Sequence, residues 1–331
     1  MHTKAKTVIV IFTPLLILTL LALFAITLGT KFISPFSIFK GDLSTVDYII
    51  VTKIRIPRIL SSILCGALLG GTGAVFQGFF RNPLADSGII GISSGATFGA
   101  VLSGLIPLGT FALVSEISLF AFSGALLSAF FVYLISKIFR ERSSVTLLLS
   151  GTAIGTFFSA VTSIIILSHE KDLHSYFAWT CGSFNAKGWN EFLVFVIPSC
   201  VALVMLELSA KHLDVLVCGE QSAKALGLNY NFVRNWILIA GSLASACAVC
   251  EGGIISFVGL IAPHIVRKIN GPKHKILIFE SMIYGAGLML ASDTLARTVI
   301  APSEIPVGII TSLVGVPFFL FALVKMNGGK K

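Results

Sequence analysis

Charged residues are scarce in this chain. Only 12% of its 331 residues are Asp, Glu, Lys or Arg, whereas about a quarter of the residues of a soluble domain are charged. Hydrophobic residues make up 55% of the chain, and its mean hydropathy is +0.95. So few charges could not supply a surface that faces water on all sides. The composition therefore excludes an ordinary soluble protein.

Long polar stretches are also missing, so no part of the sequence predicts a separate soluble domain. Apolar runs of about 20 residues, the length that crosses a bilayer core, recur along the whole chain. We therefore expect an all-α, polytopic membrane protein in which residues 1–331 form a single transmembrane domain with about ten helices. The predicted spans are 8–30, 59–80, 92–107, 111–137, 145–168, 189–209, 235–250, 254–266, 276–296 and 306–324. The boundary between the two spans within 235–266 is the hardest to place, because Glu251-Gly252-Gly253 is the only break in that stretch.

Motifs for ATP, metal or redox chemistry are absent as well. No Gly-x-x-x-x-Gly-Lys-Ser/Thr phosphate-binding loop occurs, so the chain cannot bind ATP in the usual way. Cys247 and Cys250 form a lone CxxC inside an apolar run, without the second pair that a zinc site needs. Four residues of a loop before 189–209 have metal-ligand chemistry, but mixed charges in an exposed loop are usually solvated: His169, Glu170, Asp172 and His174. We predict no metal site and no cofactor.

The positive charges indicate how the chain is oriented. The net charge is +9, which in a soluble protein would point to nucleic acid; in a membrane protein, Lys and Arg collect in cytoplasmic loops. With both termini placed in the cytoplasm, 16 of the 24 Lys and Arg residues fall on that side. The sequence thus predicts cytoplasmic termini and no nucleic-acid partner. Five outer cations need another explanation: Lys31, Lys40, Lys53, Arg55 and Arg58.

Glycines recur one helical turn apart inside three predicted spans. The pairs are Gly66 and Gly70, Gly95 and Gly99, and Gly151 and Gly155. A glycine lets helix backbones approach closely in lipid. We interpret these pairs as packing sites of a tight bundle, with no functional role of their own.

One cytoplasmic segment, about 210–234, is longer and more polar than the other loops. Its centre is typical of a short helix, with Glu220 in the first turn, where a carboxylate suits the helix dipole, and Gly227 as the C-cap. The pattern fits a handle for a soluble partner and a plain surface connector equally well.

Several motifs taken in order resemble a known family. They are Arg55-Ile-Pro-Arg58, Gly66-Ala-Leu-Leu-Gly-Gly-Thr-Gly73, Arg81-Asn-Pro-Leu-Ala85, Gly219 to Gly227, Phe257-Val-Gly-Leu-Ile-Ala-Pro-His264 and Glu304-Ile-Pro-Val-Gly308. Each motif is short, but together they are similar to the FecCD permeases of iron–siderophore, haem and cobalamin importers. The resemblance extends from about residue 50 to the end.

The resemblance implies the membrane subunit of a type II ABC importer, not an enzyme. Such a permease domain pairs with a second protomer, identical or paralogous, and cargo passes along the axis between them. Two ATP-binding subunits attach to the cytoplasmic face, and an extracytoplasmic substrate-binding protein docks outside. The expected location is the bacterial or archaeal cytoplasmic (inner) membrane. The missing phosphate-binding loop agrees with an ATPase in a partner chain.

The resemblance also implies roles for particular residues. Arg55, Arg58 and Arg297 would meet acidic residues of the binding protein; the alternative is pairing within the chain, because Asp293 lies one turn before Arg297. Asn82, Pro83, Ser143 and Ser144 would form a cytoplasmic gate, although Ser is also a common helix N-cap.

The 210–234 segment would be the ATPase coupling helix. Glu220, Ala223, Leu226 and Gly227 are its candidate residues: Ala223 is small enough for close approach, Leu226 is an apolar anchor, and Gly227 ends the helix.

Function and cargo leave alternatives open. An ion-coupled secondary transporter would need ionisable relays deep within its spans, but Glu280 and Asp293 lie near the ends of theirs. We expect a ferric siderophore or a related iron chelate as cargo, because that is the commonest assignment in the family. Haem, cobalamin and molybdate are the alternatives, and no residue decides among them.

Overall fold

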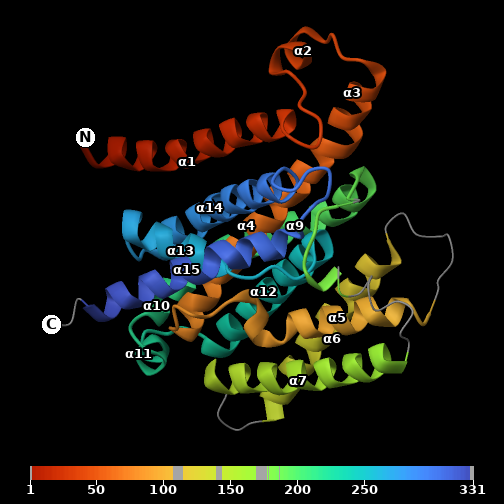
Figure 1. The fold of residues 1–331 in the computed structure, drawn as a ribbon. Helices are drawn as coiled ribbons and strands as arrows, with labels where there is room; N and C mark the ends of the chain where they lie inside the picture. Colours follow the sequence, from red (N-terminus) through yellow and green to blue (C-terminus); the bar gives the residue numbers. More distant parts are fainter. Residues whose placement is uncertain are drawn as a thin grey trace.

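The computed structural model describes residues 2–106, 115–138, 144–168, 177, 179–185 and 187–328. Throughout these ranges the regular secondary structure is helical (Figure 1). An all-α fold is therefore confirmed for the described part of the chain.

The helices follow one another through short connections. In chain order they are α1 (His2–Thr27), α2 (Pro35–Lys40), α3 (Thr45–Ile49), the π-helix η1 (Ile50–Arg55), α4 (Ile56–Phe80), the 3-10 helix η2 (Ser87–Ile90), α5 (Ile92–Ser103), α6 (Glu116–Ile138), α7 (Ser144–Ser168), α9 (Trp189–Leu208), α10 (Ala210–Leu216), α11 (Glu220–Ala225), α12 (Tyr230–Gly252), α13 (Val258–Asn270), α14 (His274–Ala296) and α15 (Val307–Gly328).

Each predicted span overlaps one of these helices. Within the described residues, six helical stretches are long and apolar enough to cross a membrane: Thr45–Phe80, Glu116–Ile138, Ser144–Ser168, Trp189–Leu216, Tyr230–Gly252 and His274–Ala296. Shorter apolar helices occupy Phe12–Thr27, Ile92–Ser103 and Val307–Ala322. The chain is thus a multi-pass membrane protein, while the count of ten crossings stays a prediction. The uncertain division of 235–266 falls where expected, because α12 ends at Gly252 and Gly253 has a φ of +74°.

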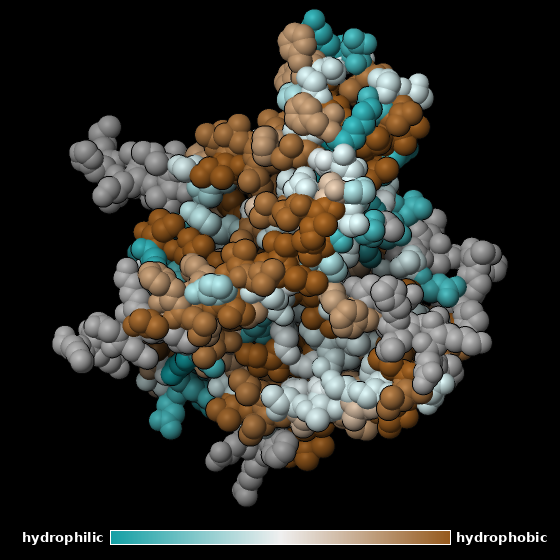
Figure 2. Space-filling model, viewed as in Figure 1, coloured by the Kyte–Doolittle hydropathy of each residue, from teal (hydrophilic) through white to brown (hydrophobic). Residues whose placement is uncertain are grey.

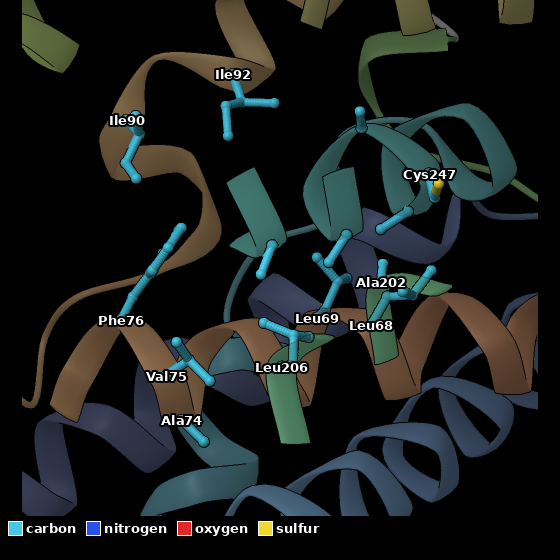
Figure 3. Close-up of a cluster of buried hydrophobic side chains, with 14 of the residues drawn as sticks. Leu68, Leu69, Ala74, Val75, Phe76, Ile90, Ile92, Ala202, Leu206 and Cys247 are labelled. Atoms are coloured by element: carbon cyan, nitrogen blue, oxygen red, sulfur yellow. The ribbon is translucent and has the colours of Figure 1, made fainter. Parts of the chain in front are cut away.

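Helix α4 lies at the centre of the bundle. Most of its residues are buried, whereas only 28% of the apolar stretch is buried in α7 and in the α9–α10 segment. Leu68 and Phe76 of α4, Leu206 of α9 and Cys247 of α12 belong to one buried cluster (Figure 3). Hydrophobic residues spread across the face of the bundle seen in Figure 2, as expected of a surface in contact with lipid.

Glycine makes close contacts between helices possible. A Cβ at Gly66 would collide with the carbonyl oxygen of Gly285 on α14, and one at Gly70 would collide with that of Ser281. Gly95 meets Gly124 of α6 in the same way, and a Cβ at Gly151 would lie 2.8 Å from the carbonyl oxygen of Ile89. The packing role predicted for the glycine pairs is confirmed at these positions.

The elements sort to two ends of the bundle. The start of α1, the end of α15 and the short helices α10 and α11 lie at one end, which we call the α11 end (Figure 1). The segment with α2 and α3 projects from the other, which we call the α2 end (Figure 1).

Candidate functional site

Five charged side chains gather at the α2 end. Arg55 ends η1, Arg58 lies in the first turn of α4, and Asp293 and Arg297 end α14, while Glu304 lies in the loop before α15. Arg55, Arg58 and Arg297 are only 4%, 6% and 3% exposed, and Asp293 is fully buried. Charged side chains are almost never buried this deeply unless they are paired.

Arg58 joins two carboxylates. Its Nη2 donates to Asp293 Oδ1 at 2.8 Å and its Nε to the same oxygen at 3.0 Å. Its Nη1 donates to both oxygens of Glu304, at 2.9 and 3.0 Å. The planar guanidinium presents several donors in a fixed geometry, so one side chain fastens α4 to α14 and to the loop that leads to α15.

Arg55 and Arg297 cap the C-terminal end of α1 by hydrogen bonds to its last carbonyl groups. Arg55 Nη1 donates to the carbonyl oxygens of Ile26 and Thr27 at 2.6 and 3.0 Å, and Arg55 Nη2 also donates to Lys31 O. Arg297 donates from Nη1 to Leu28 O at 2.8 Å and from Nη2 to Ala25 O at 2.7 Å. The last carbonyl groups of a helix have no partner within it, and these two arginines supply one.

The structure thus pairs all three predicted docking arginines within their own chain, which is the alternative weighed from the sequence. Asp293 Oδ2 also lies 3.6 Å from Arg297 Nε, as the spacing of one helical turn suggested. Direct docking through these side chains stays a prediction without geometric support, because the three guanidinium groups are buried and already bond within the chain. Of the other cations predicted to lie outside, Lys31 pairs with Asp47 at 2.5 Å, and Lys40 and Lys53 are exposed.

At the opposite end, α10 and α11 form a braced surface segment. Arg81, which ends α4 with a φ of +48°, donates to Leu216 O of α10. Asp214 of α10 lies 2.7 Å from His274 Nδ1 at the start of α14. Sequence reasoning missed both braces, because partners distant in sequence leave no local pattern.

Helix α11 follows Gly219 as its N-cap and has Leu226 as its C-cap, so Gly227, predicted as the C-cap, lies one residue further on. Gly219 has a φ of +112° and Gly227 a φ of +86°, a region that favours glycine. Gly227 N donates to Lys224 O at 3.0 Å, while Glu220 pairs with Lys224 at 2.9 Å on the exposed side.

The structure corrects the role expected of Ala223. Its side chain is fully buried in the hydrophobic core of the chain itself, so it is not the surface that a partner would approach. Its small size instead lets α11 lie against the bundle. Leu226 is 71% exposed, and Val217, which the sequence did not single out, is 63% exposed. These two apolar side chains are the ones that a partner could cover.

The predicted gate is only partly described. Asn82 Oδ1 accepts from Leu84 N at 2.9 Å, which forms a tight turn after α4. Pro83 is exposed and borders a small cavity with His264 of α13 and Phe318 of α15. Ser144 is the first residue of α7, and Ser143 lies outside the described residues. A gating role stays a prediction.

A larger groove runs beside α15. Its volume is about 600 Å³, and Cys181, Ser256, Ser312 and Leu313 are among its lining residues. All of its lining side chains are uncharged. Such a wall would offer a passing solute little to bind strongly.

The part of the chain that the structure describes contains no candidate metal site. There, no group of three or more His, Cys, Asp or Glu residues could hold a metal ion. Cys247 and Cys250 are buried thiols within α12. The loop residues His169, Glu170, Asp172 and His174 lie outside the described residues.

Comparison with known proteins gives the family. The model of the FecCD transport family matches residues 15–325. The chain belongs to this family. It is 40% identical over 275 residues to a cobalamin import system permease of Halobacterium salinarum, covering 83% of this chain and 73% of that one. It is 34% identical to an iron(3+)-hydroxamate import system permease of Bacillus subtilis, covering 99% of this chain and 100% of that one.

A solved structure has the same fold. It shows an inward-facing conformation of a metal-chelate type ABC transporter, with a TM-score of 0.85, 31% sequence identity, and coverage of 95% of this chain and 98% of that one. The FecCD-family chain is therefore an ABC importer permease, and the ion-coupled alternative is not favoured. Other relatives are named for hemin and molybdate, so membership does not determine the cargo.

Proposed function

We propose that this FecCD-family chain crosses the membrane ten times and imports a ferric siderophore or a related iron chelate by alternating access driven by a partner ATPase. The observation that carries the proposal is the braced α10–α11 segment with Leu226 exposed at its tip. A conformational change passes through a rigid element more effectively than through a loose loop. Arg81 and Asp214 tie this element to α4 and α14 respectively, both of which run through the core.

The assembly that we propose has a second permease protomer, two ATP-binding subunits at the α11 end and an extracytoplasmic binding protein at the α2 end. The charge distribution supports cytoplasmic termini, in the cytoplasmic membrane of a bacterium or archaeon. The uncharged groove beside α15 suits a pathway shared with the second protomer.

Docking at the α2 end is proposed to act through the arginine cluster. Arg55, Arg58 and Arg297 carry three positive charges against the two negative charges of Asp293 and Glu304, which leaves an excess of one. Complementary charge steers an acidic partner and fixes its register. Because the arginines are buried, we propose that they act by their field and by holding the docking surface in place.

Reconstitution tests the proposal. The permease, its cognate ATPase and its binding protein in liposomes should take up an iron-loaded siderophore only with ATP inside the compartment that holds the ATPase. An apo siderophore, cobalamin, haem and molybdate serve as matched cargoes. Uptake of one of these in place of the iron chelate would correct the cargo, and uptake driven by an ion gradient without ATP would refute the coupling.

A further inference from the structure

A second groove lies at the α11 end, and no residue of α11 or α15 lines it. It has a volume of about 420 Å³ and is formed where α9, α10, α12 and the start of α14 meet. Its lining includes Glu207, Leu208, Lys211, Phe232, Trp236 and Lys275. The roles given above to Arg81, Asp214 and Leu226 do not explain why cations, aromatic rings and one carboxylate gather in this groove.

The groove opens at the end of an exposed apolar stripe on α9. Leu193, Ile197, Val201, Val204 and Leu208 are 57%, 71%, 49%, 58% and 56% exposed. Their spacing of three or four residues places them on one face of the helix. The stripe covers the 16 residues 193–208, whose 15 rises of 1.5 Å make it about 22 Å long. An exposed apolar face of this length on a membrane-crossing helix meets lipid tails, so the groove lies where the tails give way to headgroups.

The aromatic residues of the groove suit that depth. The rings of Phe232 and Trp236 stack with centroids 6.1 Å apart, and Trp236 Nε1 donates to Met205 O at 3.2 Å. Tryptophan is enriched at the interface between membrane and water, where its ring is partly in contact with the tails.

The charged groups of the groove lack close partners among the described residues, although Lys275 is near enough to Glu207 to act on its charge. Lys211 and Lys275 are exposed and form no salt bridge within the described ranges. Glu207 Oε2 is buried and has no hydrogen-bond partner among the described residues. The two lysines and the carboxylate leave a net charge of +1, and Glu207 Oε2 is an acceptor without a donor. His212 also lines the groove, and its Nδ1 is buried without a hydrogen-bond partner among the described residues.

We propose that this groove binds one anionic phospholipid of the phosphatidylglycerol type. Its phosphate lies between Lys211 and Lys275, a headgroup hydroxyl donates to Glu207, and one acyl chain follows Leu208 onto the α9 stripe. A single phosphate neutralises the net charge, and lysines at the membrane surface attract anionic lipids. Phosphatidylcholine offers no headgroup donor, and phosphatidylethanolamine leaves the excess charge in place. Placement in the cytoplasmic leaflet rests on the proposed orientation; the site itself rests only on the membrane location.

Tryptophan fluorescence tests the site directly. The chain has three tryptophans, and Trp236 is the one that lines this groove. The full-length chain with Trp179→Phe and Trp189→Phe is placed in nanodiscs of phosphatidylcholine with a small fraction of brominated phosphatidylglycerol. Brominated phosphatidylglycerol should quench Trp236 more than the same fraction of brominated phosphatidylcholine or phosphatidylethanolamine does. The expected difference in apparent affinity is about tenfold.

Matched variants identify the residues. K211Q/K275Q should lose this preference, whereas K268Q, which removes an exposed lysine of α13 at the same end, should keep it. Native mass spectrometry of the unmodified protein and of the same lysine variants gives a second readout if the tryptophan variant does not fold. Equal binding of all three lipids, or an unchanged preference in K211Q/K275Q, would overturn the proposal. Loss of bound lipid when the cognate ATPase attaches would show that protein, and not lipid, covers the groove, and would also overturn the proposal. Transport could still proceed in that case, so the proposed function is tested separately.

Discussion

Arg58 and Asp293 are 235 positions apart in the chain, yet Arg58 Nη2 lies 2.8 Å from Asp293 Oδ1 and both side chains are buried. The pair joins the first turn of α4 to the last turn of α14, two helices whose glycines allow a close approach. Glycine therefore brings the backbones together along the helices, and the ion pair fixes them at the α2 end.

Removing one partner of this pair should destabilise the protein strongly. Asp293→Asn leaves the buried Arg58 guanidinium without its closest counter-charge, a change that typically costs about 3–5 kcal/mol. Arg58→Met in the Asp293→Asn background should cost less than the sum of the single changes, because neither member of the buried Arg58–Asp293 pair is then left without the other. Thermal unfolding in detergent measures both. Lys31→Gln, which breaks the exposed pair with Asp47, should change little; additive losses would contradict the coupling.

Two of the candidate coupling residues, Leu226 and Ala223, should respond differently to substitution. Leu226→Asp changes an exposed side chain, so the permease should unfold at its usual temperature while ATPase co-purification and ATP-dependent uptake fall at least tenfold. Ala223→Glu instead places a carboxylate in the core beneath α11 and should lower the unfolding temperature.

Val217→Asp provides a second exposed change on the same segment, and Ile269→Asp a control, since Ile269 is 57% exposed on α13. Normal ATPase retention in Leu226→Asp would remove the main support for coupling through α11.

The helices could be predicted from the sequence because a span that meets lipid must be long and apolar, and every predicted range overlaps a helix. The contacts and burial of single residues could not be predicted in this way. Arg55 lies in an outer segment in the sequence, but its hydrogen bonds are to the end of α1, and only the packed fold shows that those carbonyl groups are within reach. Ala223 has the composition of either face of a short helix, and which face is buried depends on how α11 rests on the core.

Stability should depend on pH through Lys187. Its Nζ donates to Ser118 Oγ at 3.1 Å and to Cys250 O at 2.8 Å, and burial lowers the pKa of this amine below its usual 10.5, while Glu251 acts in the opposite direction. Between the lowered pKa and 10.5, the unfolded chain binds more protons than the folded one, so stability rises with pH in that window.

The comparison with Lys187→Met isolates this effect. The unfolding temperature of the unmodified protein minus that of Lys187→Met should increase as the pH is raised from 8 to about 10. A difference that stays constant or falls would show that Lys187 has an ordinary pKa in the fold.

The orientation in the membrane can be tested with a native thiol. Cys218 is exposed between α10 and α11, whereas Cys65, Cys247 and Cys250 are buried and Cys200 is exposed on α9, where lipid would shield it. If the α11 end faces the cytoplasm, an impermeant maleimide should label Cys218 in inside-out vesicles and leave it unlabelled in intact cells. Lys53→Cys, at the exposed α2 end, should show the reverse when introduced with Cys218→Ser. The Cys218→Ser chain alone supplies the background of the remaining thiols. Labelling of Cys218 from outside intact cells would invert the orientation, and with it the sides on which the ATPase and the binding protein are proposed to attach.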